Sequence, residues 1–174
     1  MVARKLGLIF LLVLIINCFS SCINMKGAGK GDSTGYTSFY LGDGNLQYFI
    51  KPIELESEKS KFEIDFTIRQ FKGEPKIVTA NFSVFSETVA RTVEKMSLVG
   101  TEITISPITL EKIFIEGNEG DFHYRGTSTY DYVEWKTFMK SFKEVYVDGE
   151  VFLPDGKTTK QIAGLNASVM QILE

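Results

Sequence analysis

Residues 62–69 read Phe-Glu-Ile-Asp-Phe-Thr-Ile-Arg, an alternation of apolar and polar side chains that indicates β structure. Successive side chains of a strand point to opposite faces of a sheet, so Phe62, Ile64, Phe66 and Ile68 share one face. The charged and hydroxyl side chains between them share the other face. This pattern is typical of a half-buried strand.

The stretches that follow add further strands. A Lys-Gly-Glu-Pro turn at residues 72–75 and an apolar stretch at residues 77–85 predict that the first strand returns as a hairpin. A second pair is expected at residues 101–105 and 109–115, where Pro107 limits pairing to an edge or a bend. A loop at residues 116–120 then precedes a returning strand at residues 121–125.

One helix is expected at residues 131–142. Asp131 can cap it, with Glu134 three residues on, and aromatic and apolar residues recur at helical spacing on one face. Residues 87–98 fit either a helix or a strand, because Val89, Val93 and Met96 are helically spaced within a segment rich in β-branched residues.

The C-terminal third predicts another hairpin, with strands at residues 145–153 and 158–163 around a Pro-Asp-Gly-Lys turn. Residues 168–173 fit a last strand or a short terminal helix. No repeat of fixed period occurs, and the sum is roughly six to nine antiparallel strands with one helix. We therefore expect a mainly β fold, either an antiparallel β-sandwich or an α+β sheet with one amphipathic helix.

Composition bounds the size and the partners of the protein. The chain has 174 residues, enough for one domain, and 14 Phe and 7 Tyr against one Trp favour half-buried sheet surfaces. Its net charge is −3, and loss of Arg4 and Lys5 with a signal peptide would leave −3 − 2 = −5. Nucleic acid is not expected as a partner, because binding to phosphates needs a clustered basic surface.

The N-terminus has the three parts of an export signal. Arg4 and Lys5 precede an apolar run at residues 6–16, which is shorter than the roughly 18 residues needed to span a bilayer, and small residues lead to Cys22. Phe19-Ser20-Ser21-Cys22 resembles the lipobox of bacterial lipoproteins, with Phe19 where that family usually has Leu. Cys18 is the rival acceptor, but Asn17 before it is large and polar.

The resemblance implies that Cys22 carries diacylglycerol and further acyl groups after cleavage, as a lasting membrane anchor. We expect a signal peptide at residues 1–21, a lipidated cysteine with a flexible linker at residues 22–35, and one β-rich domain at residues 36–174. Ile23 after the cysteine, in place of a retaining Asp, favours the outer membrane facing the periplasm.

The sequence gives little indication of a catalytic or a metal-binding site. His123 is the one histidine, and no second metal-ligand motif accompanies it, so we expect it to be structural or exposed. Gly31-Asp32-Ser33-Thr34-Gly35 matches Gly-x-Ser-x-Gly letter by letter, but it lies in the expected linker with no strand before it, so it does not indicate a nucleophile. Asp148, Glu150 and Asp155 lack calcium-loop spacing and are interpreted as solvated turn residues. We expect no catalytic residues, no metal and no cofactor, and an enzyme activity is disfavoured but open.

Aromatic residues are the remaining candidates for binding. Tyr124, Tyr130, Tyr132 and Trp135 could contact a glycan or a protein, although their spacing also fits the core face of a helix on a sheet. The sequence thus favours a lipid-anchored envelope lipoprotein that acts as a non-enzymatic binding or assembly module, through a sheet edge or an aromatic patch. A glycan-binding or glycan-processing lipoprotein is the alternative.

Overall fold

The computed structural model describes residues 35–71, 77–87, 92–118 and 120–173, with the backbone alone for residues 169–172. The chain divides into two units, residues 1–30 and 31–174, and all described residues belong to the second. Cys22 and the expected linker up to residue 34 lie outside the described residues.

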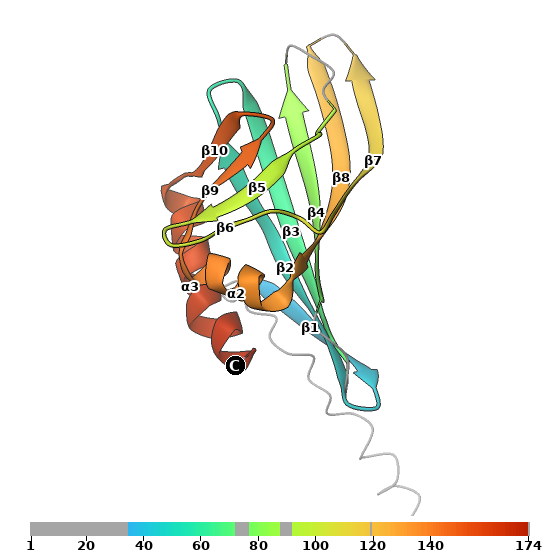
Figure 1. Cartoon of the computed structure of the whole chain (residues 1–174), viewed down its shortest axis with the longest axis vertical. Coiled ribbons are helices and arrows are strands. Elements are labelled where there is room, and N and C mark those ends of the chain that lie inside the picture. The colour runs from blue at the N-terminus through green and yellow to red at the C-terminus, as the bar shows by residue number, and fades with distance from the viewer. Residues whose placement is uncertain (1–34, 72–76, 88–91, 119, 174) are drawn as a thin grey trace, which may run out of the picture. The chain divides into compact units, whose positions relative to one another are not determined.

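Ten antiparallel strands of the described residues form one curled sheet (Figure 1). Their order is β6-β5-β9-β10-β2-β3-β4-β8-β7, and β1 pairs with β2 beside this path. In chain order the strands are β1 (Tyr36–Gly42), β2 (Asn45–Glu56), β3 (Ser60–Gln70), β4 (Ile77–Ser86), β5 (Met96–Gly100), β6 (Thr104–Ile105), β7 (Thr109–Asn118), β8 (Asp121–Asp131), β9 (Phe142–Val147) and β10 (Glu150–Pro154). The mainly β prediction is confirmed, as an α+β sheet rather than a sandwich.

The central hairpin is the one that the alternating sequence predicts. β3 pairs with β4 from Ser60 to Arg69, with Ile64 opposite Phe82 and Phe66 opposite Ala80. These inward side chains are completely buried. The opposite side chains of β3 and β4, which are polar in most places, form the outer face of the sheet.

The sheet curls where β10 changes partners. Residues 150–152 of β10 pair with β9, whereas Leu153 and Pro154 pair with the end of β2. β1 pairs with the first half of the same edge of β2, up to Ile50. Pro52 lies between these two stretches, in a bulge of β2 between Ile50 and Ile53. Proline has no backbone N–H group, and at this bulge no hydrogen bond between strands requires one.

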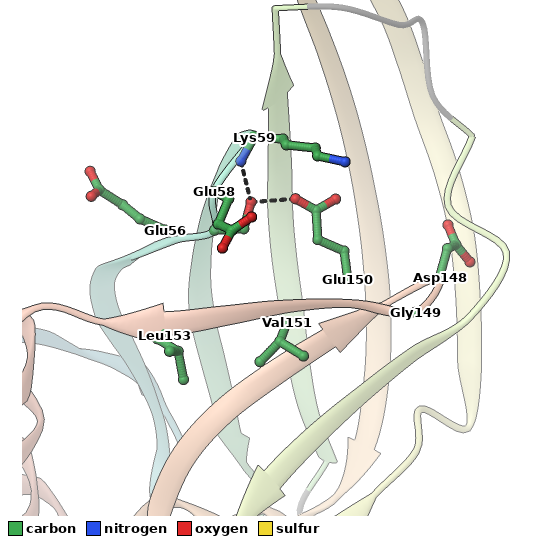
Figure 2. Close-up of a pocket in the computed structure, with 9 residues that line it drawn as sticks. Glu56, Glu58, Lys59, Asp148, Gly149, Glu150, Val151 and Leu153 are labelled. Carbon is green, nitrogen blue, oxygen red and sulfur yellow. Dashed lines mark hydrogen bonds between the residues drawn. The ribbon is translucent and has the colours of Figure 1, made fainter.

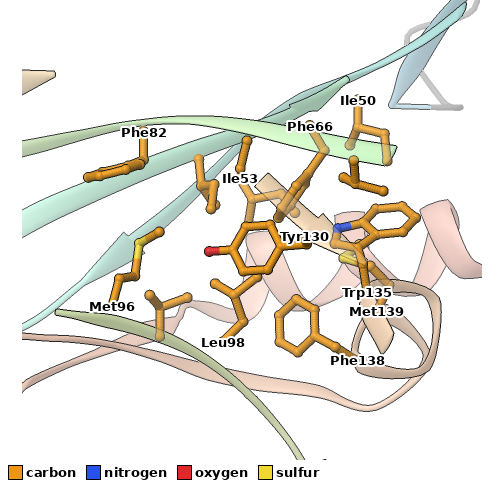
Figure 3. Packing of buried hydrophobic residues seen from close by; sticks show 14 of the residues in the cluster. Ile50, Ile53, Phe66, Phe82, Met96, Leu98, Tyr130, Trp135, Phe138 and Met139 are labelled. Carbon is orange, nitrogen blue, oxygen red and sulfur yellow. The ribbon is translucent and has the colours of Figure 1, made fainter. Parts of the chain in front are cut away.

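Helix α2 (Tyr132–Lys140) supplies part of the core. The Asp131 carboxylate caps it as predicted, accepting hydrogen bonds from the N–H groups of Val133 at 2.8 Å and Glu134 at 3.1 Å. Trp135 packs edge-on against Phe66 of β3, with ring centroids 5.4 Å apart. Figure 3 shows these rings together with Tyr130, Phe138 and Met139 among the aliphatic side chains of the sheet.

A second helix, α3 (Gly156–Ile172), corrects the prediction for the C-terminal third. Residues 158–163 are helical and not a strand, because Asp155 caps a helix here: its carboxylate accepts a hydrogen bond from the N–H of Thr158 at 2.6 Å. The hairpin turn lies earlier, at Asp148 and Gly149, both with positive φ, between β9 and β10. Residues 168–172 belong to the helix, one of their two predicted alternatives.

The pairing predicted for residues 101–105 and 109–115 is also wrong. β6 pairs with β5, whereas β7 pairs with β8 at the opposite edge of the sheet, so residues 106–108 cross between the two edges. Of residues 87–98, for which the sequence fits either a helix or a strand, the last three, from Met96, belong to strand β5. The predicted return of β7 into β8 is confirmed, with Asn118 opposite Asp121.

Candidate functional site

The free edge of β7 is the most exposed regular element of the described sheet. β7 lies at the end of the strand order and pairs with β8 on one side only. Ile113 is 52% exposed, and Phe114 and Ile115 are each 37% exposed. An edge strand carries a row of unpaired N–H and C=O groups, so it can accept a further strand. The opposite edge, β6, has only two residues.

A bulge divides β7 into two parts. The register shifts between Lys112 and Phe114, so Ile113 is the extra residue opposite the regular ladder of β8. Bulges and charges commonly protect edge strands from pairing, and β7 has both, with Glu111 and Lys112 before the bulge. Beyond it, residues 114–118 form a regular stretch in which Phe114 lies on the outer face and Ile115 on the inner face.

A polar network adjoins this edge on the outer face. His123 Nε2 lies 3.0 Å from Ser83 Oγ, and His123 Nδ1 lies 3.3 Å from a carboxylate oxygen of Glu116. Arg125 donates from Nη1 to Ser83 Oγ at 2.9 Å and from Nη2 to the Asp65 carboxylate at 3.2 Å. The network therefore links β3, β4, β8 and β7 side by side.

The order carboxylate, histidine and serine resembles that of a hydrolytic triad, but the surroundings do not suit a nucleophile. Ser83 is 2% exposed, and its oxygen accepts a hydrogen bond from Arg125. It lies on β4, which is paired on both sides, so the backbone N–H groups around it belong to the ladder and offer no oxyanion hole. The arrangement is that of a structural network which fixes the surface beside β7.

Aromatic rings attach the edge strand to this network. The His123 ring stacks on Phe85 at 4.5 Å with an interplanar angle of 16°, and Phe114 meets it edge-on at 5.2 Å. Phe114 is thus held from one side by His123 while part of its surface stays open. The edge consequently presents an apolar side chain in a fixed position.

An open groove lies between the β2–β3 turn and the β9–β10 hairpin (Figure 2). Its volume is about 760 Å³, and it is lined by carboxylates together with Lys59, Val151 and Leu153. Two of the carboxylates are engaged: Asp148 accepts from the N–H of Lys95 at 2.7 Å, and Glu150 accepts from the Ser57 hydroxyl. Among the described residues, no three potential ligands gather as a metal site requires.

The four aromatic residues proposed from the sequence are buried. Tyr124, Tyr130, Tyr132 and Trp135 all belong to the core. The Tyr132 hydroxyl donates to the carbonyl of Leu173 at 2.8 Å, and burial raises the pKa of Tyr130 above its ordinary value. The residues that sequence reasoning missed lie on β7. The sequence feature that could have pointed to them is Ile113-Phe114-Ile115, three consecutive apolar residues where a half-exposed strand would alternate apolar and polar residues.

Comparisons with known proteins add no assignment. No family model, curated protein sequence or solved structure matches this chain. Within the part of the chain that the structure describes, no helix has the length and apolarity needed to cross a bilayer. The functional argument therefore starts from the β7 edge and from the resemblance of residues 19–22 to a lipobox.

Proposed function

We propose that this protein is a lipid-anchored lipoprotein of the cell envelope, without enzymatic activity, whose domain binds an envelope protein through the β7 edge. The observation that carries the proposal is the exposed run Ile113-Phe114-Ile115 on a strand whose outer edge pairs with no other strand of the described residues. The anchor rests on the resemblance of residues 19–22 to a lipobox, and the outer membrane on Ile23 after the cysteine.

The binding mode is addition of a strand. An extended segment of the partner hydrogen-bonds to the free backbone groups of residues 114–118, and its side chains alternate between the two faces. Phe114 offers it an apolar contact on the outer face, beside His123. Ile115 offers one on the inner face. Backbone pairing supplies affinity in this mode, and the two apolar contacts supply selectivity.

Amine-reactive crosslinking of intact cells tests the edge, because Lys112 lies on β7 itself. We expect recurrent crosslinks from Lys112 to one envelope protein, and their loss in Ile115→Glu, where a charge would face the partner's strand. Leu153→Glu is the control, since Leu153 is an exposed apolar residue of the groove and not of the edge. Crosslinks from Lys112 that persist in Ile115→Glu would contradict the proposed site.

Intact-mass spectrometry of the membrane fraction tests the anchor. We expect a mature chain that begins at Cys22 with added acyl groups, and their loss in Cys22→Ala. A mature chain cleaved elsewhere and unchanged by the substitution would show that the domain is secreted without lipid. The crosslinking result would still stand after this outcome, because it tests the β7 edge and not the anchor.

Glycan binding is the second candidate, and one observation favours it. A hollow of about 670 Å³ on the other side of the β2–β3 turn places Phe85 near the carboxylates of Glu63 and Asp121. Rings beside carboxylates are common in sugar sites, but His123 already covers one face of Phe85. Binding on a glycan array that is lost in Phe85→Ala would favour this function over the protein-binding one.

A further inference from the structure

A second exposed apolar surface lies at the tip of the β1–β2 hairpin. Phe39, Tyr40 and Leu41 are consecutive and about half exposed, and Phe49 of β2 is 38% exposed. The Phe39 and Phe49 rings meet edge-on at 5.4 Å, and the Tyr40 hydroxyl accepts a hydrogen bond from the N–H of Gly44 at 3.1 Å. The aromatic side chains are therefore held in place by the hairpin.

Charge is scarce in this hairpin. Within residues 36–51, Asp43 and Lys51 are the ionisable groups that carry charge at neutral pH, and their charges cancel. Five of these sixteen residues are Phe or Tyr. The chain as a whole is 24% charged and has a net charge of −3. A neutral, aromatic-rich tip on an acidic protein suits an interface between water and lipid, where aromatic side chains with a polar end are enriched.

The hairpin and the candidate binding edge lie toward opposite ends of the sheet. Arg69 of β3 lies next to the tip, and the residues opposite it in the successive strands β4 and β8 are Ile77 and Asp131. Lys61 of β3 lies at the other end, and the residues opposite it in β4, β8 and β7 are Phe85, His123 and Glu116. The eight residue steps from Lys61 to Arg69 along β3 span about 26 Å at the usual rise of a strand. Figure 1 shows the β1–β2 turn at the lower end and the β7–β8 end at the top.

The length of the tether fits a contact between the tip and the bilayer. Thirteen residues, 23–35, separate Cys22 from β1 in the sequence, and a fully extended chain of that length reaches about 45 Å. The seven residues of β1 span about 23 Å between the tether and the turn. The tip can therefore return to the lipid surface without full extension of the tether.

We propose that the tip of the β1–β2 hairpin rests in the lipid surface to which Cys22 is anchored, with Phe39, Tyr40 and Leu41 at the boundary between headgroups and acyl chains. This inference rests on the proposed lipid anchor. It gives the tethered domain one orientation, in which residues 114–118 of β7 point away from the membrane. The edge is then available to a partner that extends into the aqueous space.

Site-directed fluorescence tests the contact in the lipidated full chain. Once Cys22 is acylated and Cys18 is removed with the signal peptide, an introduced cysteine is the sole free thiol. Leu41→Cys and Leu153→Cys form a matched pair, because both leucines are 51% exposed and Leu153 lies opposite Glu56, at the far end of β2. Each variant is labelled with an environment-sensitive dye and reconstituted in vesicles of phosphatidylethanolamine and phosphatidylglycerol.

We expect the dye at position 41 to shift its emission to the blue and to be quenched by nitroxides on the lipid acyl chains, while the dye at position 153 reports water. Equal emission and equal quenching at the two positions would overturn the proposal. A dye at position 41 that is shielded from water but not quenched by lipid nitroxides would also overturn it, because a protein surface would then cover the tip.

The mass of the same reconstituted sample separates this inference from the proposed function. Acylated protein with a water-exposed dye at position 41 would refute the contact and leave the anchor in place. Protein without acyl groups would refute the anchor. A second variant pair, Phe39→Ser and Phe49→Ser with the label at position 41, should weaken the lipid quenching while the circular dichroism spectrum stays unchanged.

Discussion

The guanidinium of Arg125 on β8 lies 3.2 Å from the carboxylate of Asp65 on β3, across the intervening strand β4. The same guanidinium donates to Ser83 of β4 at 2.9 Å, and Asn81 of β4 donates to Asp65 at 3.0 Å. Both charged side chains are less than a third exposed. Three strands are thus connected by side chains as well as by their backbone ladders.

Arg125→Leu is expected to lower the free energy of unfolding by about 1–3 kcal/mol, because Asp65 and Ser83 would each lose a donor in a partly buried position. Urea denaturation followed by circular dichroism measures the effect. Arg69→Leu is the control on the same face, since Arg69 donates to Gln47 at an exposed site and its loss should cost within about 0.5 kcal/mol. Equal losses in the two variants would show that the network adds no more stability than the exposed contact of Arg69 with Gln47.

Gly126→Ala is expected to lower the free energy of unfolding by about 1–3 kcal/mol, since an added methyl group overpacks the core. A Cβ at this position of β8 would lie 2.5 Å from Cζ of Phe82, which is completely buried. Gly156→Ala at the start of α3 is the matched control, because a Cβ there meets nothing within 4 Å. In thermal unfolding, the Tm of Gly156→Ala should equal or exceed that of the parent protein. A Gly126→Ala variant with the Tm of the parent protein would refute the close packing.

Acid should weaken the start of α3 through Asp155. The backbone N–H and the hydroxyl of Thr158 donate to this carboxylate and hold its pKa below the ordinary value of 3.8. A carboxylate whose pKa is lower in the folded than in the unfolded protein stabilises the fold at pH values above its unfolded pKa. This contribution is lost as the pH falls through the folded pKa. In Asp155→Asn, the difference in urea midpoint from the parent should therefore be constant above about pH 5 and shrink below about pH 4. A difference independent of pH would contradict the assignment.

Asp131→Ala should cost about 1 kcal/mol of stability, because the N–H groups of Val133 and Glu134 lose their acceptor at the first turn of α2. Asp131→Ser tests the cause, since a serine hydroxyl can accept the same bonds and should restore most of the loss. The measurement is again the urea midpoint. If both variants lost equal stability, the negative charge of Asp131 rather than its hydrogen bonds would be responsible.

The sequence by itself determined the elements whose signals are local. The alternation at residues 62–69 and the apolar stretch at residues 77–85 marked β3 and β4, and Asp131 with the aromatic spacing after it marked α2. Such signals are readable because the period of a strand or the cap of a helix involves neighbours in the chain. The same local reading failed at Asp155, because Pro-Asp-Gly-Lys suits a hairpin turn and a helix start alike. The expected signal peptide, lipidation and envelope location stay predictions.

Tertiary structure alone decided which segments pair and which side chains stay exposed. The ladder places Ser83 beside His123 and Arg125, about forty residues further along the chain, and places β7 at an edge rather than next to β6. Strand pairing depends on contacts between distant residues, which a period of two along one strand does not encode. For this reason Tyr124 and Trp135 could be proposed for binding yet lie in the core, whereas Ile113 and Phe114 became candidates only once β7 was found unpaired on one side.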